Sequence, residues 1–424
     1  MPSGRVSSQL FQRAVRVLPG GVSSPVRYYP PYPRFIRRGR GSHIVDVEGN
    51  DYVDLTLAYG PLLMGHAHPV VERAVKDQLR RGTIFGAPTA LEVEVAELLR
   101  DRFPSMEMAR FVTTGGEAAL SLLRLARGAT GKGGVAKIDG GFHGSIDQLL
   151  VSAGSGAASV ASSEGVFPSS VTPTYLLPFN DIEAAEALLE RQKDIGLLLV
   201  EPVMGNMGTI IPQPEYLRAL RTLTRRHSVL LGFDEVITGF HAGHGGAQGR
   251  YEVTPDLTML GKVLGGGLPL AAYGGRRDLL SRVAPSGGVY QAGTYSGNPL
   301  SLAAARSVLR WLTPARMRRV ERGTQSLVAD LEGAFRERAV PVQIPHVGSM
   351  FSIFLSDREI RSATDVRKSR TQEYVRFARS MLKEGVFLPQ NPFESLFLSA
   401  VHSAPDRARV VRAAQRSISR AIVI

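Results

Sequence analysis

Short apolar runs alternate with amphipathic stretches over the central part of the chain. The runs at 109–112, 197–200 and 230–233 predict strands. Apolar positions that repeat every three to four residues predict helices near 90–102, 117–127, 181–192, 214–227 and 298–312. Strands of this kind separated by helices are typical of a parallel sheet that is buried on both faces. We therefore predict an α/β fold for residues 60–312, with a mostly parallel central sheet covered by helices.

The two flanking segments have a different pattern. Residues 1–59 are rich in proline and contain one candidate hairpin, with strands at 42–47 and 52–55 joined by a turn at 48–50. Residues 313–424 predict a smaller α+β domain, with a strand near 349–355 and helices near 316–338, 364–384 and 405–421. A chain of 424 residues exceeds one ordinary core. We therefore expect an N-terminal segment at 1–59, a large domain at 60–312 and a C-terminal domain at 313–424.

Residues 153–165 are almost entirely glycine, serine and alanine. A segment of this composition buries little apolar surface, so one interpretation is a mobile lid over a binding site. A surface insert without a function fits the composition equally well.

Composition narrows the class of protein and the chemistry. Hydrophobic residues make up 43% of the chain and charged residues 21%, as in globular proteins. No run of about 18 apolar residues predicts a membrane span, and the N-terminus lacks the apolar core of a signal peptide, so we expect a cytoplasmic protein. The absence of cysteine excludes disulfides, thiolate metal sites and cysteine nucleophiles. The pairs His66/His68 and His241/His244 have no third ligand at helical spacing, so no metal is expected.

The formal net charge of +13 raises the question of nucleic-acid binding. The basic residues are spread along the chain, often in pairs such as Arg37-Arg38 and Arg80-Arg81, and they form no basic run interleaved with aromatic residues. A positive electrostatic field that attracts small anionic molecules is an equally good explanation of the net charge. We expect a small-molecule substrate and no nucleic-acid or membrane partner. A basic, nucleic-acid-associated protein that only keeps the fold is the alternative of another class.

Asp234 and Lys262 are the strongest candidates for chemistry. Asp234 follows the apolar run 229–233, and Lys262 lies 28 positions later, with two residues between it and the three glycines at 265–267. A carboxylate at the carboxyl end of a buried strand can hold a protonated ring nitrogen. A lysine in apolar surroundings has a lowered pKa and forms imines. Pyridoxal phosphate requires both groups, which makes it the expected cofactor.

Two glycine-containing motifs suit the same cofactor. Thr114, Gly115 and Gly116 follow a predicted strand and open a helix, an arrangement in which free backbone amides bind an anion such as phosphate. Phe142 and His143 lie between glycines, where the phenyl ring can stack on a flat heterocycle and the imidazole can donate to it. Taken alone, the first motif is also an ordinary helix cap and the second an ordinary buried turn.

Beyond these single motifs, the chain resembles the class III, fold-type I aminotransferases, which use pyridoxal phosphate. The resemblance covers nearly the whole sequence. Its matching stretches are Pro19–Arg27, Gly65–Pro69, Phe85–Thr89, Glu201–Gly208, Phe233–Phe240 and Tyr290–Pro299. The first and third of these stretches are typical of the aminomutases within that family.

The resemblance implies a role for each matching residue. Lys262 would link covalently to the cofactor and move the proton, and Asp234 would bind the pyridinium nitrogen. The residues implied in cofactor binding are Thr114, Gly115, Gly116, Phe142, His143, Asn206, Asp234, Val236, Lys262 and Thr294, the last from a second subunit of a homodimer. The residues implied in substrate binding are Ser24 and Arg27, for a carboxylate, together with Tyr59, Ser155, Tyr290 and Glu394.

The implied activity is an intramolecular amino transfer that converts glutamate-1-semialdehyde to 5-aminolevulinate for tetrapyrrole synthesis, with pyridoxal phosphate and pyridoxamine phosphate as cofactor forms. Some positions depart from the family pattern. Thr114-Gly115-Gly116 replaces Ser-Gly-Thr, Tyr59 replaces a tryptophan, and Phe142 replaces a tyrosine. These changes keep the cofactor chemistry and bear on the substrate. The alternative is an intermolecular aminotransferase that acts on a β- or ω-amino acid with a keto-acid acceptor.

Overall fold

A seven-stranded sheet forms the centre of the molecule in a computed structural model, which describes residues 4–152, 163–171 and 173–422. Its strands, in spatial order, are β4 (Met108–Val112), β10 (Ala271–Gly275), β9 (Leu257–Leu260), β8 (Leu230–Glu235), β7 (Ile195–Val200), β5 (Gly134–Ile138) and β6 (Thr174–Leu177). Strands β9, β8, β7, β5 and β6 pair in parallel, and β10 runs antiparallel to both of its neighbours. The predicted α/β fold with a mostly parallel sheet is confirmed.

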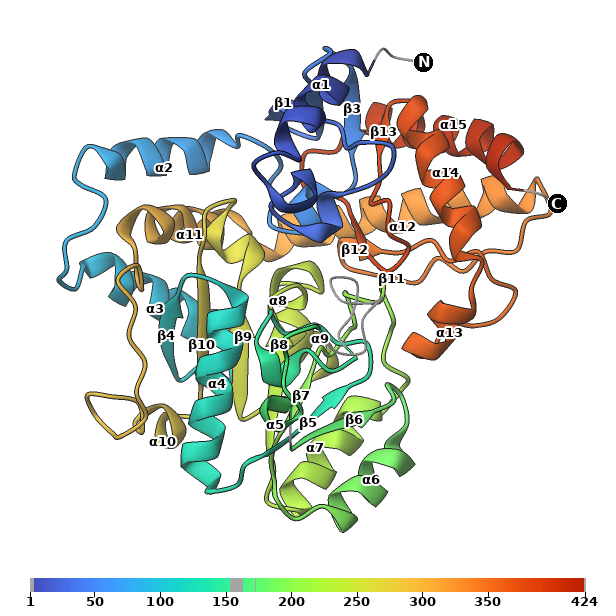
Figure 1. The fold of residues 1–424 in the computed structure, drawn as a ribbon. Helices are drawn as coiled ribbons and strands as arrows, with labels where there is room; N and C mark the ends of the chain where they lie inside the picture. The colour runs from blue at the N-terminus through green and yellow to red at the C-terminus, as the bar shows by residue number, and fades with distance from the viewer. Residues whose placement is uncertain (1–3, 153–162, 172, 423–424) are drawn as a thin grey trace.

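Strand β7 shows why the central strands are apolar throughout. Leu197 and Leu199 pack into one cluster with α4 (Gly115–Thr130), whereas Leu198 and Val200 pack into another with α6 (Ile182–Arg191) and α7 (Tyr216–Arg226). Both faces of the strand are therefore buried, and neither can carry alternating polar residues. Figure 1 shows α4 on one side of this sheet and α6 and α7 on the other.

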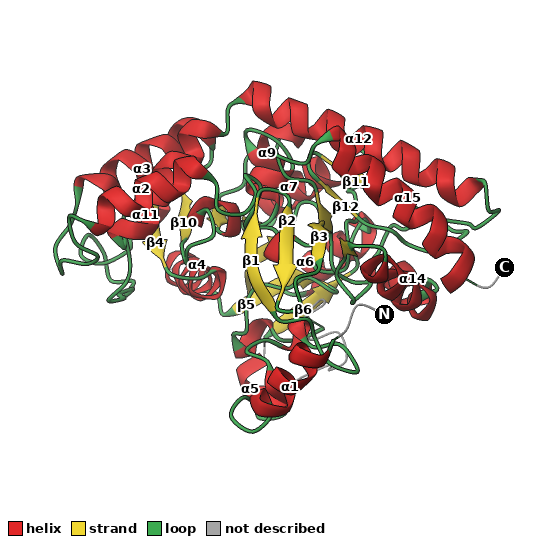
Figure 2. Cartoon of the chain, turned by 90° about the horizontal axis from the view of Figure 1, so that it is seen from above, coloured by secondary structure: helices red, strands yellow, loops and turns green. Residues whose placement is uncertain are grey.

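Further helices extend the layers on either side. Those around the large sheet are α2 (Pro69–Leu79), α3 (Ala90–Arg102), α5 (Pro168–Val171), α8 (Thr238–His241), α9 (Gly246–Tyr251), α10 (Arg277–Leu280) and α11 (Pro299–Trp311). Helices α2 and α11 lie side by side, and α3 packs on α11 (Figures 1 and 2). None of the helices in the described part of the chain is both long and apolar enough to cross a bilayer.

The N-terminal and C-terminal parts of the chain share one sheet. Strands β1 (Ile36–Arg40), β2 (His43–Asp46) and β3 (Asp51–Asp54) form an antiparallel meander, and β13 (Val386–Phe387) adds to β3 in parallel. A second small sheet consists of β11 (His346–Val347), β12 (Met350–Phe351) and β14 (Leu396–Phe397). The predicted hairpin is confirmed, and its partner strand from the other end of the chain was not foreseen.

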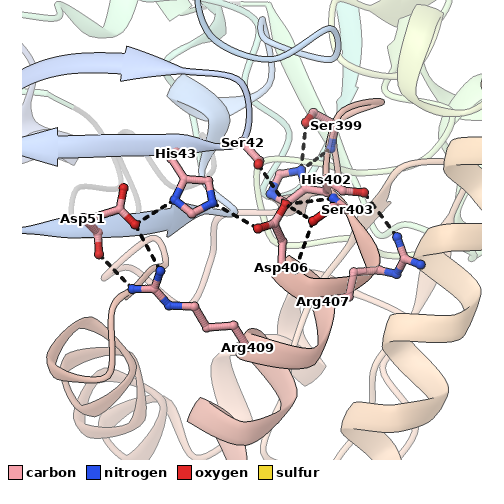
Figure 3. A network of polar contacts seen from close by, with 9 residues as sticks. All are labelled: Ser42, His43, Asp51, Ser399, His402, Ser403, Asp406, Arg407 and Arg409. Atoms are coloured by element: carbon pink, nitrogen blue, oxygen red, sulfur yellow. Dashed lines mark hydrogen bonds and ion pairs between the residues drawn. The ribbon is translucent and has the colours of Figure 1, made fainter.

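The helices of these outer parts are α1 (Arg5–Ala14), α12 (Pro314–Arg336), α13 (Ala363–Lys368), α14 (Thr371–Lys383) and α15 (Ala404–Ala421). In Figure 2 the meander lies near the middle of the view, with α12 and α15 beside it. A network of polar contacts ties β2 and β3 to the start of α15, with His43 between Asp51 and Asp406 (Figure 3).

One sequence-based prediction in the C-terminal part is wrong, and another is confirmed only in part. The single helix predicted at 364–384 is two helices, because the chain becomes extended at Ser369 and the amide of Arg370 donates to Leu355 O. The strand predicted at 349–355 is present only as β12. Ser352 N still donates to Pro345 O in register with β11, but Pro345 has no N–H to return the bond, and further along only an isolated bridge joins Phe354 to Gln343. Apolar periodicity indicates which positions are buried. It does not indicate where backbone hydrogen bonding interrupts a helix or a strand.

Candidate active site

Asp234 and Lys262 come from neighbouring parallel strands. Asp234 is the second-last residue of β8 and pairs with Met259 of β9. Lys262 follows the end of β9 by two residues. The carboxyl ends of parallel strands meet at one edge of a sheet, where ligands of α/β proteins bind. Both side chains line a cavity of about 410 Å³, which we call the central cavity.

The carboxylate of Asp234 is held in a fixed orientation. Its side chain is 5% exposed. Its Oδ2 lies 2.7 Å from His143 Nδ1, and its Oδ1 accepts a hydrogen bond of 3.0 Å from Val236 N. Two partners on two oxygens prevent rotation of the carboxylate, so it presents one constant edge to the cavity.

Lys262 has the environment of a reactive amine. Burial lowers the pKa of its ammonium group, and the carboxylates of Glu394, Glu201 and Asp234 partly oppose that shift. Its backbone φ of 47° lies in the left-handed region, which non-glycine residues rarely occupy. A lowered pKa increases the fraction of neutral amine, which is the form that attacks a carbonyl.

One end of the central cavity is suited to an anion. Gly115 and Gly116 open α4, a helix of 16 residues, and their backbone amides donate to no group in the described part of the chain. The positive end of the helix dipole adds to these free donors. Thr114 caps the helix by accepting from Glu117 N at 3.2 Å. A Cβ added at Gly144, which has φ +86°, would lie 2.4 Å from Gly116 Cα, so only glycine allows the two loops to touch here.

Glu201 belongs to the same site, although the sequence analysis did not single it out. It follows the last residue of β7, and its Oε1 accepts from Phe142 N at 3.0 Å. Its Oε2 accepts from Gly205 N at 2.8 Å and from Asn206 Nδ2 at 3.0 Å. Burial, together with the nearby charge of Asp234, raises its pKa. A carboxylate directly after a buried strand is the signal that identified Asp234, and it would have found Glu201 too.

The structure brings most of the predicted cofactor residues together. The lining of the central cavity includes Thr114, Gly115, Gly116, Phe142, His143, Asn206, Asp234, Val236 and Lys262. Thr294 is not part of this lining and is exposed in the connection between β10 and α11. The roles of all these residues stay predictions.

The predicted substrate residues lie outside the lining or at its margin. Tyr59 donates to Val26 O at 2.6 Å, which brings it close to Arg27, whose charge acts on its hydroxyl. Glu394 is buried, and its charge acts on both Tyr59 and Lys262. Ser24 is half-buried in the N-terminal segment, and Tyr290 is 69% exposed. Ser155, with most of the segment 153–165, lies outside the described residues.

The central cavity fits a phosphorylated heteroaromatic ring. Nε2 of His143 is buried, yet none of the groups in the described ranges pairs with it, so it has an unused bond for a polar substituent. Phe142 and Val236 supply apolar walls, and the free amides of α4 supply an anion site. No group of three or more potential metal-ligating side chains occurs among residues 4–152, 163–171 and 173–422.

Known proteins are similar to this chain over nearly its whole length, and the similarity is not limited to the cavity. Residues 25–392 match the sequence profile described as Aminotransferase class-III. The glutamate-1-semialdehyde 2,1-aminomutase of Roseiflexus castenholzii is 48% identical over 404 residues, which cover 94% of this chain and 93% of that protein. An omega-transaminase from Sphaerobacter thermophilus has a TM-score of 0.92 at 35% identity, covering 98% of this chain and 97% of its own. A glutamate-1-semialdehyde-aminomutase from Pseudomonas aeruginosa PAO1, solved in complex with PMP, has a TM-score of 0.89 at 26% identity, covering 99% of this chain and 95% of its own.

Proposed function

The chain belongs to the class-III aminotransferase family, and from this premise we propose that it converts glutamate-1-semialdehyde to 5-aminolevulinate in tetrapyrrole biosynthesis. It is an isomerase that uses pyridoxal phosphate and pyridoxamine phosphate. Relatives named for this activity are 44% to 48% identical to the chain over at least 94% of its length. The observation that carries the proposal is the meeting of Asp234 and Lys262 in one cavity at the ends of adjacent strands.

The reaction exchanges an amino group and a carbonyl oxygen between neighbouring carbons of one molecule. Atoms and electrons balance without a second substrate. When bound, the cofactor supplies a carbon that exchanges nitrogen with the substrate and a ring that withdraws electrons from the carbon losing its proton. The side chains of the protein must therefore bind, orient and transfer protons.

Lys262 is the group we assign to proton transfer. Its Nζ faces the central cavity, and burial lowers the pKa of the ammonium, so both the neutral and the charged form are accessible. A general base works best when its pKa lies near the working pH. Lys262 would carry a proton between a substrate carbon and the cofactor carbon that shares its nitrogen.

Asp234 and His143 keep the ring an electron acceptor. The carboxylate is fixed by His143 Nδ1 and by Val236 N, and it would hold the proton on the ring nitrogen when the cofactor is bound. Glu201 supports them by fixing the backbone at Phe142, whose ring forms a wall of the cavity. The first-turn amides of α4 and the hydroxyl of Thr114 hold the phosphate, so the ring enters in one orientation.

We assign the substrate carboxylate to Ser24 and Arg27. Arg27 lies near Tyr59, and Glu394 lies near both Tyr59 and Lys262. A guanidinium binds a carboxylate with two parallel hydrogen bonds, which fixes the distance from the carboxylate to the reacting carbons.

A homodimer would complete the site. In the sequence Thr294 stands between Tyr290 and Tyr295, whose side chains are exposed. This segment adjoins the start of α3, because Asn298 Nδ2 donates to Thr83 O at 3.1 Å, and Ile84, Phe85 and Val93 are exposed beside it. Exposed apolar side chains gathered in this way are typical of a subunit interface. Thr294 would then reach the phosphate of the partner subunit.

The second candidate is intermolecular amino transfer to a keto acid. It is favoured by the TM-score of 0.92 with an omega-transaminase, which shows that the fold alone does not separate the two activities. The assay that separates them supplies glutamate-1-semialdehyde to the holoenzyme with no keto acid. We expect 5-aminolevulinate to form at full rate. Product that appears only after addition of 2-oxoglutarate would support the aminotransferase instead.

A further inference from the structure

Four consecutive residues next to the active site adopt left-handed backbone conformations. They are Leu57, Ala58, Tyr59 and Gly60, with φ of 45°, 55°, 66° and 114°. Left-handed conformations are unfavourable for residues with a Cβ, and three of these four residues have one. Such a turn persists only when surrounding groups hold it. The hydrogen-bond partners of the turn therefore determine where it places the side chains that it carries or contacts.

Two side chains hold the turn at its ends. Asp54 Oδ1 accepts from Thr56 N at 2.8 Å and from Leu57 N at 3.0 Å. At the other end, Gly60 O accepts from His241 Nε2 at 2.7 Å. His241 comes from α8, which directly follows β8 and Asp234. The turn is thus fastened to the element that carries the cofactor residues.

The hydrogen bonds of His241 determine its tautomer. A carbonyl oxygen can only accept, so the Nε2 of His241 must carry the hydrogen. Its Nδ1 lies 2.7 Å from Ser349 Oγ, and in a neutral ring this nitrogen accepts from the serine hydroxyl. The ring is 1% exposed and packs at 4.4 Å from the ring of Phe397. Burial lowers the pKa of His241 to about 3, so the ring stays neutral in the working range.

The turn lies directly against Lys262. A Cβ added at Gly60 would lie 3.3 Å from Lys262 Cδ and 3.4 Å from His241 Nε2. Tyr59, the residue before it, donates to Val26 O and so faces the segment that carries Arg27. One strained turn therefore contacts the stem of the amine and also carries an aromatic side chain toward the substrate end.

We propose that His241 is a positioning residue, which holds the turn Leu57–Gly60 through Gly60 O and thereby sets the placement of Lys262 and Tyr59. The proposal rests on the proposed function only in assigning reactive roles to those two residues. A displacement of about 1 Å at a reacting group lowers a rate about 100-fold. A hydrogen bond that holds the turn can therefore control the reaction rate without touching the substrate. His241 itself is not among the residues that line the central cavity.

The test compares His241→Phe, which keeps a flat ring and removes both hydrogen bonds, with His241→Gln, whose amide can donate to Gly60 O. Cofactor-free protein is mixed with pyridoxal phosphate, and the absorbance of the lysine-linked cofactor is followed at one pH. We expect His241→Phe to slow this capture by about 10- to 100-fold and to lower kcat more than it raises KM. His241→Gln should recover most of both.

Two further variants keep the test decisive. Ser349→Ala leaves the imidazole and its bond to Gly60 O but removes the hydrogen bond at Nδ1, so it should show a smaller loss in the same direction even if His241→Phe does not fold. His227→Phe is the matched control, because His227 caps the end of α7 just before β8, at the opposite edge of the sheet. Capture that is equally fast in His241→Phe and in the wild type would overturn the proposal. Capture needs no substrate, so this result is independent of whether the protein proves to be a mutase.

Discussion

At the scale of the residue, the amine of Lys262 lies within reach of the charges of several carboxylates in and around the central cavity. Glu394, Glu201 and Asp234 all act on Lys262, and they keep its pKa from falling as far as burial alone would take it. Asp234 is tied to His143, and Glu201 is tied to backbone amides, so neither is free to form a close pair with the amine. Lys262 therefore keeps access to a neutral form.

Arg27→Ala tests the assignment of the substrate end. Hydrogen bonds to a charged group contribute about 1.5–3 kcal/mol, so the change should raise KM for the semialdehyde by about 10- to 100-fold. The absorbance of the bound cofactor should not change, because Arg27 is not part of the cavity lining. Steady-state kinetics with Arg37→Ala, an exposed arginine on β1, provide the control. Kinetics of Arg27→Ala equal to those of the control would remove Arg27 from the site.

The sequence was informative for residues that follow apolar strands. Asp234 and Lys262 could be predicted because each stands where a buried run ends, and the structure places both at one edge of the sheet. His241 could not be predicted, since its role depends on Gly60 and Ser349, which lie far from it in the sequence. The assigned roles of the site residues are still predictions.

At the scale of the element, the N-terminal meander is joined to α15 by one histidine. His43 Nδ1 lies 2.8 Å from Asp51 Oδ2, and its Nε2 lies 3.0 Å from Asp406 Oδ1 (Figure 3). Both ring nitrogens face carboxylates, an arrangement that favours the doubly protonated ring. Burial lowers the pKa of His43, but the bonds to Asp406 and Asp51 outweigh it, and the net shift is upward.

This upward shift predicts a pH dependence of stability. A pKa raised on folding contributes stability that is complete below the unfolded value, about 6.5. That contribution is lost as the pH rises through the higher folded value. The thermal midpoint should therefore fall as the pH rises above about 6.5, by a modest amount because the pair is partly exposed. His43→Gln should flatten this part of the curve, and an unchanged slope in that variant would contradict the assignment.

Element predictions succeeded where burial alone decides the structure. The strands at 109–112, 197–200 and 230–233 are confirmed because they are buried against helices. The helix predicted at 364–384 failed because a backbone bond from Arg370 to Leu355 interrupts it. The pairing of β13 with β3 joins segments more than three hundred residues apart, and no local pattern encodes it.

At the scale of the whole molecule, one group of exposed apolar side chains lies near an edge of the large sheet. Phe85 is 52% exposed near the start of α3, and Tyr290 and Tyr295 are exposed on the connection after β10. The strand at that edge is β4, whereas β6 forms the opposite edge. A second copy of the chain on the β4 side would cover these side chains and bring its own Thr294 to the phosphate site.

Phe85→Glu tests this arrangement. A buried, unpaired carboxylate opposes association, so light scattering should show the mass falling from twice the chain mass of 45.8 kDa toward a single chain. Cofactor affinity should fall as well, because Thr294 of the partner would be lost from the site. Leu176→Glu, on the exposed edge strand β6, should leave the mass unchanged. A Phe85→Glu protein of undiminished mass would exclude this face as the interface.

The most direct test of the account is to map the lysine that holds the cofactor. The chain has seven lysines, and Lys137 is also buried, with a pKa lowered by burial to about 8. Its Nζ, however, donates to Gly141 O at 2.8 Å and to Val151 O at 2.7 Å, whereas Lys262 faces the cavity. Borohydride reduction of the holoenzyme, followed by proteolysis and mass spectrometry, should place the cofactor on Lys262 alone. A label on Lys137 or on any other lysine would contradict the account.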